Sequence, residues 1–326
     1  MEKMHVGILG AGNIAGTMAK TLTKMEGVCF YAIASRSLEK AKDFAGLYGA
    51  KIFYGSYEEM LQDEKVDLVY IATPHSEHFA NMKSCISYGK PILCEKSFTA
   101  NAEQAEEIIK LAEEKGVFVT EAIWTRYMPM ISIIKKLIDE KNIGKPIFLS
   151  ANMSYPMEHK QRLSDPMLAA GALLDVGVYT LNFAAIFFGD KINRISSICT
   201  YTDTGMDRSE AITLIYDDGR MACLNSSQSC VGDRKGIIHG TLGYLVIENI
   251  NNYEKVVIYN SDHKKVRSID APRQISGYEY EVEACRTALL ENRLECPEMP
   301  HEETIRIMHI MDKLRKEWGV VFPFEK

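Results

Sequence analysis

The sequence predicts an α/β protein in which a doubly wound parallel sheet is followed by a second α/β region with a mainly antiparallel sheet. The chain has 326 residues, more than a single hydrophobic core usually supports, so two domains are expected. Over about the first 125 residues, short apolar runs alternate with amphipathic stretches. Beyond that point, strand-like runs separated by turn residues replace the alternation.

The first region is predicted to alternate strands and helices. Its apolar runs predict strands at residues 5–9, 30–34, 68–72, 92–94 and 117–120. Between them apolar residues recur at intervals of three and four, which predicts helices at residues 13–24, 38–48, 57–61, 77–88 and 102–115. Because strands that alternate with helices form parallel sheets with covered faces, residues 1–125 are predicted to form one domain.

The second region, residues 126–326, has a different pattern. A helix is predicted at 130–141, a strand at 147–153 and a long apolar helix at 168–188. From about residue 195 to 269, turn residues such as Asp217-Asp218-Gly219 and Asn251-Asn252 separate strand-like runs and favour antiparallel neighbours. Helices predicted at 278–290 and 302–318 end the chain and are expected to pack back on the rest.

Composition excludes several classes of protein. The net charge of −6 offers no basic surface for a phosphate backbone, so nucleic acid is not an expected partner. The apolar run within the first nine residues is too short for a signal peptide or a membrane span, so we expect a cytoplasmic protein without a membrane partner. The eight cysteines include no CxxC pair and are expected to be reduced thiols.

A glycine-rich turn follows the first strand. Gly10 and Gly12 precede Asn13 and Ile14, where a helix begins, and Ala15 completes a GxGxxA pattern. Gly10 would permit the tight turn, Gly12 would let the backbone approach a pyrophosphate, and Ala15 is small enough for close packing of helix and strand. The strand, turn and helix together predict a Rossmann domain that binds a dinucleotide at the helix N-terminus.

The end of the second strand predicts which dinucleotide is bound. Where NAD enzymes commonly carry an acid for the ribose hydroxyls, this chain has Ser35, Arg36 and Ser37. A guanidinium attracts a 2′-phosphate that a carboxylate would repel. NADP(H) is therefore the preferred cofactor, and NAD(H) is the alternative if Arg36 is merely solvated or stacks on the adenine.

Two polar clusters follow later strands of the same sheet. Thr73, Pro74, His75 and His78 come after the strand at 68–72, and Glu95 with Lys96 follows the strand at 92–94. Ligands bind at the carboxyl edge of open α/β sheets, so these residues are candidates for the cofactor site. No Cys, Asp or Glu stands at a spacing that would complete a metal site with the histidines, so no catalytic metal is expected.

These motifs together resemble the Gfo/Idh/MocA family of oxidoreductases. The turn at residues 10–15, the run that ends at His78 and the Glu95-Lys96 pair carry the resemblance. The segments at residues 121–127 and 171–179 are most similar to the branch with dimeric dihydrodiol dehydrogenases and NADP-dependent xylose dehydrogenases. The resemblance implies an open, mainly antiparallel sheet in residues 126–326, a domain that binds substrate and pairs subunits into a homodimer.

The resemblance also implies a reaction, hydride transfer between NADP(H) and a sugar, polyol, diol or matching carbonyl compound. Lys96 matches the family's essential lysine beside the nicotinamide, and Glu95 matches its partner. Tyr179 is the expected proton donor and acceptor, with Asp175 four residues earlier on one helix face. The scheme requires Lys96 and Tyr179 to meet beside the nicotinamide.

Further residues are assigned by position. Trp124 and Arg126 are expected to line the nicotinamide side, although Trp124 could equally be a core residue. The candidates for substrate binding are Tyr155, His159, Arg162 and Asn182. The chain also departs from the family, which usually has proline where Ser97 stands and often has aspartate where Asn182 stands. Ser97 leaves the position of Lys96 less constrained than proline would.

Three alternative functions are kept open. An NAD-dependent sugar or inositol dehydrogenase would share the chemistry. A non-catalytic regulator that senses nucleotides would need none of Lys96, Asp175 and Tyr179. A redox-neutral enzyme that retains its nicotinamide would release no reduced cofactor.

Overall fold

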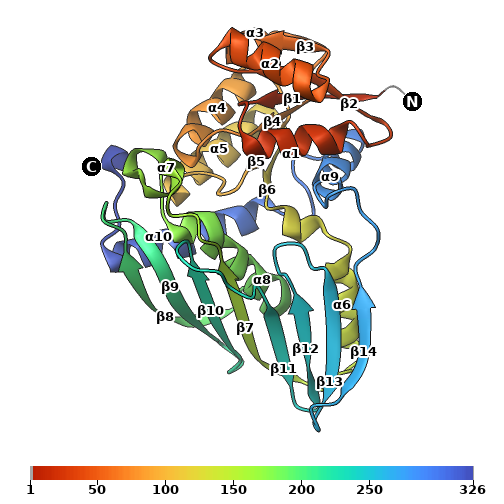
Figure 1. The fold of residues 1–326 in the computed structure, drawn as a ribbon, viewed down its shortest axis with the longest axis vertical. Coiled ribbons are helices and arrows are strands. Elements are labelled where there is room, and N and C mark those ends of the chain that lie inside the picture. The colour runs from red at the N-terminus through yellow and green to blue at the C-terminus, as the bar shows by residue number, and fades with distance from the viewer. Residues whose placement is uncertain (1–2, 326) are drawn as a thin grey trace. The chain divides into compact units, whose positions relative to one another are not determined.

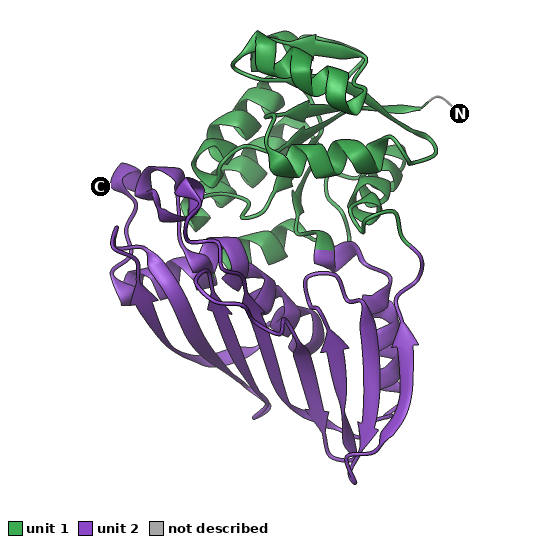
Figure 2. Ribbon diagram, viewed as in Figure 1, with its two compact units in different colours: residues 1–124, 274–309 green, residues 125–273, 310–326 purple. Residues whose placement is uncertain are grey.

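The computed structural model describes residues 3–325 (Figure 1). Its contacts divide the chain into two units (Figure 2). The first unit runs to Trp124 and also includes Gln274–His309, and the second comprises Thr125–Arg273 and continues from Ile310. Residues 274–309, which the sequence prediction counted with the second domain, therefore belong to the first unit.

The first unit contains a parallel sheet in the order β3-β2-β1-β4-β5-β6. Its strands are β1 (Met4–Leu9), β2 (Val28–Ala34), β3 (Ile52–Tyr54), β4 (Leu68–Ile71), β5 (Ile92–Glu95) and β6 (Val119–Ala122). The strand order confirms the predicted doubly wound fold. The additional strand β3 has only three residues at the sheet edge, too few to produce an apolar run in the sequence.

Helices connect these strands. They are α1 (Asn13–Leu22), α2 (Leu38–Tyr48), α3 (Tyr57–Leu61), α4 (His75–Ser87) and α5 (Ala102–Lys115). Ser37, Ser56 and Asn101 cap the N-termini of α2, α3 and α5 with side-chain oxygens. From β1 the chain builds the sheet outward in both directions, and right-handed crossovers then place the connecting helices on both faces. The contacts of α1 with α2 and of α4 with α5 agree with this arrangement.

The second unit is built on an eight-stranded sheet in the order β14-β13-β12-β11-β7-β10-β9-β8. The strands are β7 (Pro146–Ser154), β8 (Ile192–Tyr201), β9 (Asp207–Tyr216), β10 (Met221–Ser227), β11 (Gly236–Gly240), β12 (Gly243–Glu248), β13 (Lys255–Asn260) and β14 (Lys265–Asp270). Only β7 and β10 pair in parallel, so the mainly antiparallel prediction is confirmed. Helix α6 (Met130–Asp139), the short α7 (Gln161–Ser164) and α8 (Val178–Phe188) complete this part.

The single long helix predicted at residues 168–188 is wrong in its first part. The structure has a 3-10 helix at Pro166–Leu168, then a single turn of π-helix at Leu173–Gly177, called the π-turn below, and then α8. Ala169 and Gly171 have φ of 55° and 127°, which no helix accommodates. The segment Pro166–Phe188 is apolar and long enough to cross a membrane, but 83% of its most apolar window is buried in the structure. Helix α8 packs on β7 and β10.

One face of the second sheet carries a row of aromatic side chains. Phe148, His239, Tyr244 and Tyr259 lie opposite one another on neighbouring strands. Successive ring centroids in this row are 5.4, 5.9 and 4.9 Å apart. These side chains are only partly buried, whereas the residues next to them, such as Leu149 and Leu245, are fully buried on the other face.

The segment that returns to the first unit carries α9 (Glu279–Leu290) and the start of α10 (His301–Trp318). It is tied to β6, because the Val119 N–H donates to the Leu294 carbonyl at 3.0 Å and a ring nitrogen of His301 lies 2.9 Å from the Val119 carbonyl. Tyr278 stacks on Trp124 with ring centroids 4.2 Å apart. These contacts explain why the segment belongs to the first unit.

Helix α9 buries one carboxyl completely. Glu281 is 0% exposed, and neither of its oxygens has a hydrogen-bond partner among residues 3–325. Burial and the charge of Glu95 raise its pKa well above the ordinary value. The other titratable groups with which it interacts are Tyr70, Cys285 and Cys296. Glu281 is therefore a neutral acid in the folded protein near pH 7.

A pH series of unfolding experiments tests this assignment. Unfolded Glu281 ionises above about pH 4.5, whereas the folded group stays protonated, so stability is lost as the pH rises towards the folded pKa. Relative to a Glu281→Gln variant, the wild type should lose up to about 1.4 kcal/mol of unfolding free energy per pH unit as the pH rises above about 5. Exposed Glu302 gives the control variant, Glu302→Gln, which should show no such trend. If the difference in unfolding free energy between the wild type and Glu281→Gln stayed constant with pH, the assignment would be contradicted.

Candidate active site

The glycine turn is dictated by the packing of the first sheet. Gly10 has φ of 100°, and a Cβ at this position would lie 2.9 Å from the Ala72 carbonyl oxygen. Gly12 is the N-cap residue of α1, and the nearest atom to a Cβ built there is 3.9 Å away. The turn thus leaves the backbone at the start of α1 open to a ligand. Exposed Asn13 and partly buried Ile14 form the first turn of that helix.

The side chains after β2 differ in exposure. Ser35 is buried, whereas Arg36 is exposed and close enough to Tyr57 for its charge to influence the pKa of that phenol. The Ser37 hydroxyl accepts the Lys40 N–H as the cap of α2. Arg36 is therefore the group at this strand end that is available to a phosphate.

His78 joins the loops that follow β4 and β5. It is fully buried, and its ring nitrogens lie 2.9 Å from the carbonyl oxygens of Thr73 and Ser97. Asn81 donates to the Thr73 hydroxyl at 3.0 Å, and Pro74 is the N-cap of α4, which begins at His75. His78 therefore acts on any bound group through the loops that it positions.

Lys96 stands on the loop whose start is held by Glu95. Lys96 is partly buried, and the peptide bond to Ser97 is cis. Glu95 accepts the hydroxyl of Tyr70 and, at 3.2 Å, the backbone N–H of Lys96. Burial and the charge of Glu95 raise the pKa of Tyr70 well above its ordinary value, so the phenol stays a donor.

A second buried carboxylate holds the far side of this loop. Glu121, at the end of β6, accepts the Phe98 N–H at 3.2 Å and the Thr304 hydroxyl at 3.4 Å. The backbone on both sides of Lys96 is thus fixed by carboxylates on neighbouring strands. Trp124, stacked on Tyr278, is 6% exposed, and its indole N–H has no hydrogen-bond partner in the described part of the chain.

The second unit brings together Asp175, Arg162 and Tyr179. Asp175 lies within the π-turn and is almost completely buried, and Tyr179 follows in the first turn of α8 at 8% exposure. Arg162 pairs with Asp175 through contacts of 2.7 and 3.5 Å, while 44% of its side chain remains exposed. This pair neutralises a carboxylate that would be costly to bury alone.

The remaining predicted residues of the second unit lie in separate contacts. The Arg126 guanidinium donates to the Asn182 side-chain oxygen at 2.6 Å, and Asn182 is fully buried in α8. The Tyr155 hydroxyl accepts from Arg234 at 2.9 Å and from Asn251 at 3.1 Å. His159 is exposed, three residues before Arg162 in the segment that leads into α7.

Several contributors were missed by the sequence prediction. Tyr70 and Glu121 hold the Lys96 loop through hydrogen bonds, and Glu281 is a buried acid whose pKa is raised in part by the charge of Glu95. Asp207 and Glu210 contact the π-turn of the second unit. Of these residues Glu121 had a signal in the sequence, since it directly follows the strand predicted at residues 117–120. Among the described residues, no three His, Cys, Asp or Glu side chains are grouped so that they could hold a metal ion.

Comparison with known families matches both parts of the chain. Residues 4–123 match the oxidoreductase family with an NAD-binding Rossmann fold, Gfo/Idh/MocA, and residues 131–246 match the Gfo/Idh/MocA C-terminal domain. Trans-1,2-dihydrobenzene-1,2-diol dehydrogenase of Xenopus laevis is 33% identical over 97% of this chain and 98% of its own. The enzyme of the same name from Bos taurus is 31% identical over 98% of both chains.

Solved structures share the fold at lower identity. A 3-ketoreductase from Actinomadura kijaniata in complex with NADP and TDP-benzene superposes with a TM-score of 0.87 at 24% identity over 97% of this chain and 98% of its own. An aldose-aldose oxidoreductase from Caulobacter crescentus complexed with glycerol gives 0.88 at 18% identity over 98% of both chains. The matched domains and full-length relatives together show that this chain belongs to the Gfo/Idh/MocA family and is an NAD(P)-dependent dehydrogenase acting on CH–OH groups.

Proposed function

We propose that this protein is an NADP(H)-dependent dehydrogenase whose substrate is a sugar, a polyol, a diol or the matching carbonyl compound. The observation that carries the proposal is the loop of Lys96, whose backbone is held on both sides by the buried carboxylates of Glu95 and Glu121, at the edge of the sheet where the glycine turn also lies. A sensor of nucleotides would need no such group. Two comparisons support the substrate class. The relatives are named as dehydrogenases of a diol, and one structural neighbour is an aldose-aldose oxidoreductase complexed with glycerol.

The nicotinamide, when bound, accepts or supplies a hydride at the substrate carbon. The residues of this chain then handle the substrate oxygen. Tyr179 exchanges the proton of that oxygen, and Lys96 polarises it through its positive charge. Asp175, held by Arg162, binds a substrate hydroxyl or orients Tyr179.

Substrate binding is assigned to Arg162, His159, Tyr155 and Asn182. The Arg162 side chain stays 44% exposed while it pairs with Asp175, so its guanidinium can also reach substrate hydroxyls. Asn182 and Tyr155 already bond Arg126 and Arg234, so they would shape the site. Trp124 and Arg126 would line the nicotinamide side.

The preference for NADP(H) rests on Arg36. Its exposed guanidinium follows β2, where an acid would serve NAD, and no carboxylate occupies residues 35–37. A structural neighbour was solved with NADP, which agrees with this preference. NAD(H) is the alternative cofactor.

We further propose a cytoplasmic homodimer that pairs through the open face of the second sheet. The aromatic row of Phe148, His239, Tyr244 and Tyr259 stands on that face, with Ile198 70% exposed on β8. Contiguous apolar side chains on an exposed sheet favour association. A C2 interface would use the same row on both subunits.

Cofactor titrations test the role of Arg36. An Arg36→Ala variant should bind NADP about 10- to 100-fold more weakly, because paired bonds to a charged phosphate are lost, and should bind NAD as the wild type does. Lys42→Ala, which removes an exposed charge from α2, is the control. Equal affinities of the wild type for NADP and NAD would refute the preference.

An NADP-linked activity screen over aldoses, polyols, diols and dicarbonyls tests the reaction. With the best substrate, Tyr179→Phe should lower kcat by at least about 100-fold, since general acid–base transfer contributes that much, while cofactor affinity is preserved. Tyr253→Phe alters another buried phenol of the second unit and serves as the control. Normal turnover by Tyr179→Phe would remove the assigned role.

Light scattering tests the dimer. The wild type should have the mass of two chains, and Tyr244→Glu should shift it towards one because it buries an unpaired charge in the interface. Leu242→Glu places the same charge on an exposed loop and should leave the mass unchanged. Retained NADP binding shows that the variants are folded. A wild type with the mass of one chain would contradict the proposal.

A further inference from the structure

Strand β9 carries two buried carboxyls with no role in the proposed chemistry. Asp207 and Glu210 are 0% and 4% exposed, although residues three apart on a regular strand point to opposite faces. The pairing with β8 explains this, because Thr200 lies opposite Ser209 while Tyr201 lies opposite Asp207. Arg208 is thus the extra residue of a β-bulge, which turns both acids to the same buried side.

Asp207 contacts the beginning of the π-turn. Its carboxylate accepts the Leu173 N–H at 2.5 Å, and Leu173 is the first residue of the turn. Gly171, two residues earlier, has φ of 127°, and a Cβ there would overlap an Asp207 oxygen. This close approach requires glycine at position 171.

Glu210 contacts the end of the same turn. A Cβ on Gly177 would overlap a carboxyl oxygen of Glu210, so the carboxyl lies directly against this part of the backbone. The Thr180 hydroxyl donates to the Gly177 carbonyl at 2.9 Å and lies 3.4 Å from the hydroxyl of Ser226, the β10 residue opposite Glu210. Burial and the charge of Asp207 raise the pKa of Glu210 well above its ordinary value, which keeps it neutral.

We propose that Asp207 and Glu210 are positioning residues that hold the two ends of the π-turn and thereby orient Asp175 within it and Tyr179 just after it. The proposal rests on the proposed function, in which Tyr179 exchanges a proton with the substrate. A π-turn contains one more residue than an α-helical turn, and such turns occur at functional sites. If the turn relaxed to α-helix, side chains on one side of it would rotate by about 100° relative to those on the other.

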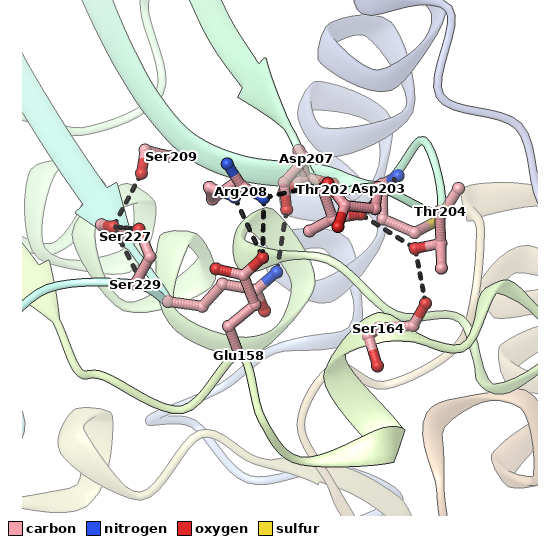
Figure 3. Close-up of polar contacts among 12 residues, drawn as sticks. Glu158, Ser164, Thr202, Asp203, Thr204, Asp207, Arg208, Ser209, Ser227 and Ser229 are labelled. Atoms are coloured by element: carbon pink, nitrogen blue, oxygen red, sulfur yellow. Dashed lines mark hydrogen bonds and ion pairs between the residues drawn. The ribbon is translucent and has the colours of Figure 1, made fainter.

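The bulge and the loop before it also contact the segment of residues 158–164 (Figure 3). Arg208 donates to Glu158 at 3.0 Å and lies 3.6 Å from Asp203, while the Thr204 hydroxyl donates to the Ser164 carbonyl at 2.6 Å. Glu158 and Ser164 bracket Arg162, which reaches Asp175 in the turn. The bulge thus supports both the turn and the segment that contacts it.

Charged groups on other elements also face these acids. Arg315 of α10 and Cys199 of β8 interact with Asp207, and the backbone of Leu173 lowers the pKa of its carboxyl, yet burial raises this pKa to about 6. Asp207 is therefore ionised at neutral pH, whereas Glu210 is not. Because glutamine is an isostere of a neutral carboxyl but not of a charged one, the test is made at Glu210.

The test compares Glu210→Ala with Glu210→Gln, the isostere of the neutral acid. Glu210→Ala should lower kcat by on the order of 100-fold, the effect of a displaced catalytic group, and leave NADP affinity unchanged. Glu210→Gln should restore kcat to within about threefold of wild type, because a neutral amide fills the same space. Gly177→Ala should also lower kcat. The double variant Gly177→Ala/Glu210→Ala should lose less kcat than the product of the two single-variant effects, because both substitutions disturb the same contact.

A second readout does not depend on activity. 3-Fluorotyrosine placed at position 179 should give a ¹⁹F signal that shifts or broadens in Glu210→Ala and returns in Glu210→Gln, while fluorotyrosine at position 253 reports no change. An unchanged signal in Glu210→Ala would overturn the inference even if kcat fell. A wild type that oxidises no CH–OH substrate would refute the proposed function, and the ¹⁹F signals would still decide whether Glu210 positions Tyr179.

Discussion

The cofactor half of this enzyme depends on the adjacency of β1 and β4 at the centre of the parallel sheet. The strand order reverses at this point, so the chain leaves β1 beside the end of β4, and Gly10 passes the Ala72 carbonyl too closely for any Cβ. The glycine turn is therefore shaped by the packing of the sheet. The same edge receives the loops after β4 and β5, so Lys96 stands at a neighbouring strand end and His78, in the first turn of α4, contacts both loops.

Both units bury carboxyl groups near their proposed functional residues. The cost of burying each group is reduced by hydrogen bonds, by an ion pair or by protonation. Glu95 accepts two hydrogen bonds, and Asp175 pairs with Arg162. Glu281 and Glu210 avoid charge by staying protonated. Buried charge is expensive, so a fold optimised for stability alone would have few such groups. Their concentration here is typical of sites where polar side chains must be held in place.

In this chain, Ser97 stands where the family usually has proline, and contacts from other elements hold the backbone there instead. Proline would restrict the backbone after Lys96 by its own ring. In this chain the Ser97 carbonyl contacts His78 and the next N–H donates to Glu121, so side chains from two other elements hold the loop. The constraint on Lys96 is thus supplied by tertiary contacts.

The sequence by itself determined the alternating architecture of the first unit, the glycine turn and the strand-end clusters, because periodicity and short motifs are local properties of the chain. It also identified the residues that match the family. The three-residue β3 and the return of residues 274–309 to the first unit could not be predicted, since each depends on pairing with distant segments. The β9 bulge, the π-turn and the partners Tyr70, Glu281, Asp207 and Glu210 were decided only by the tertiary structure. A buried acid has the same local sequence signal as an exposed one, and only packing determines which carboxyl loses its water and its charge.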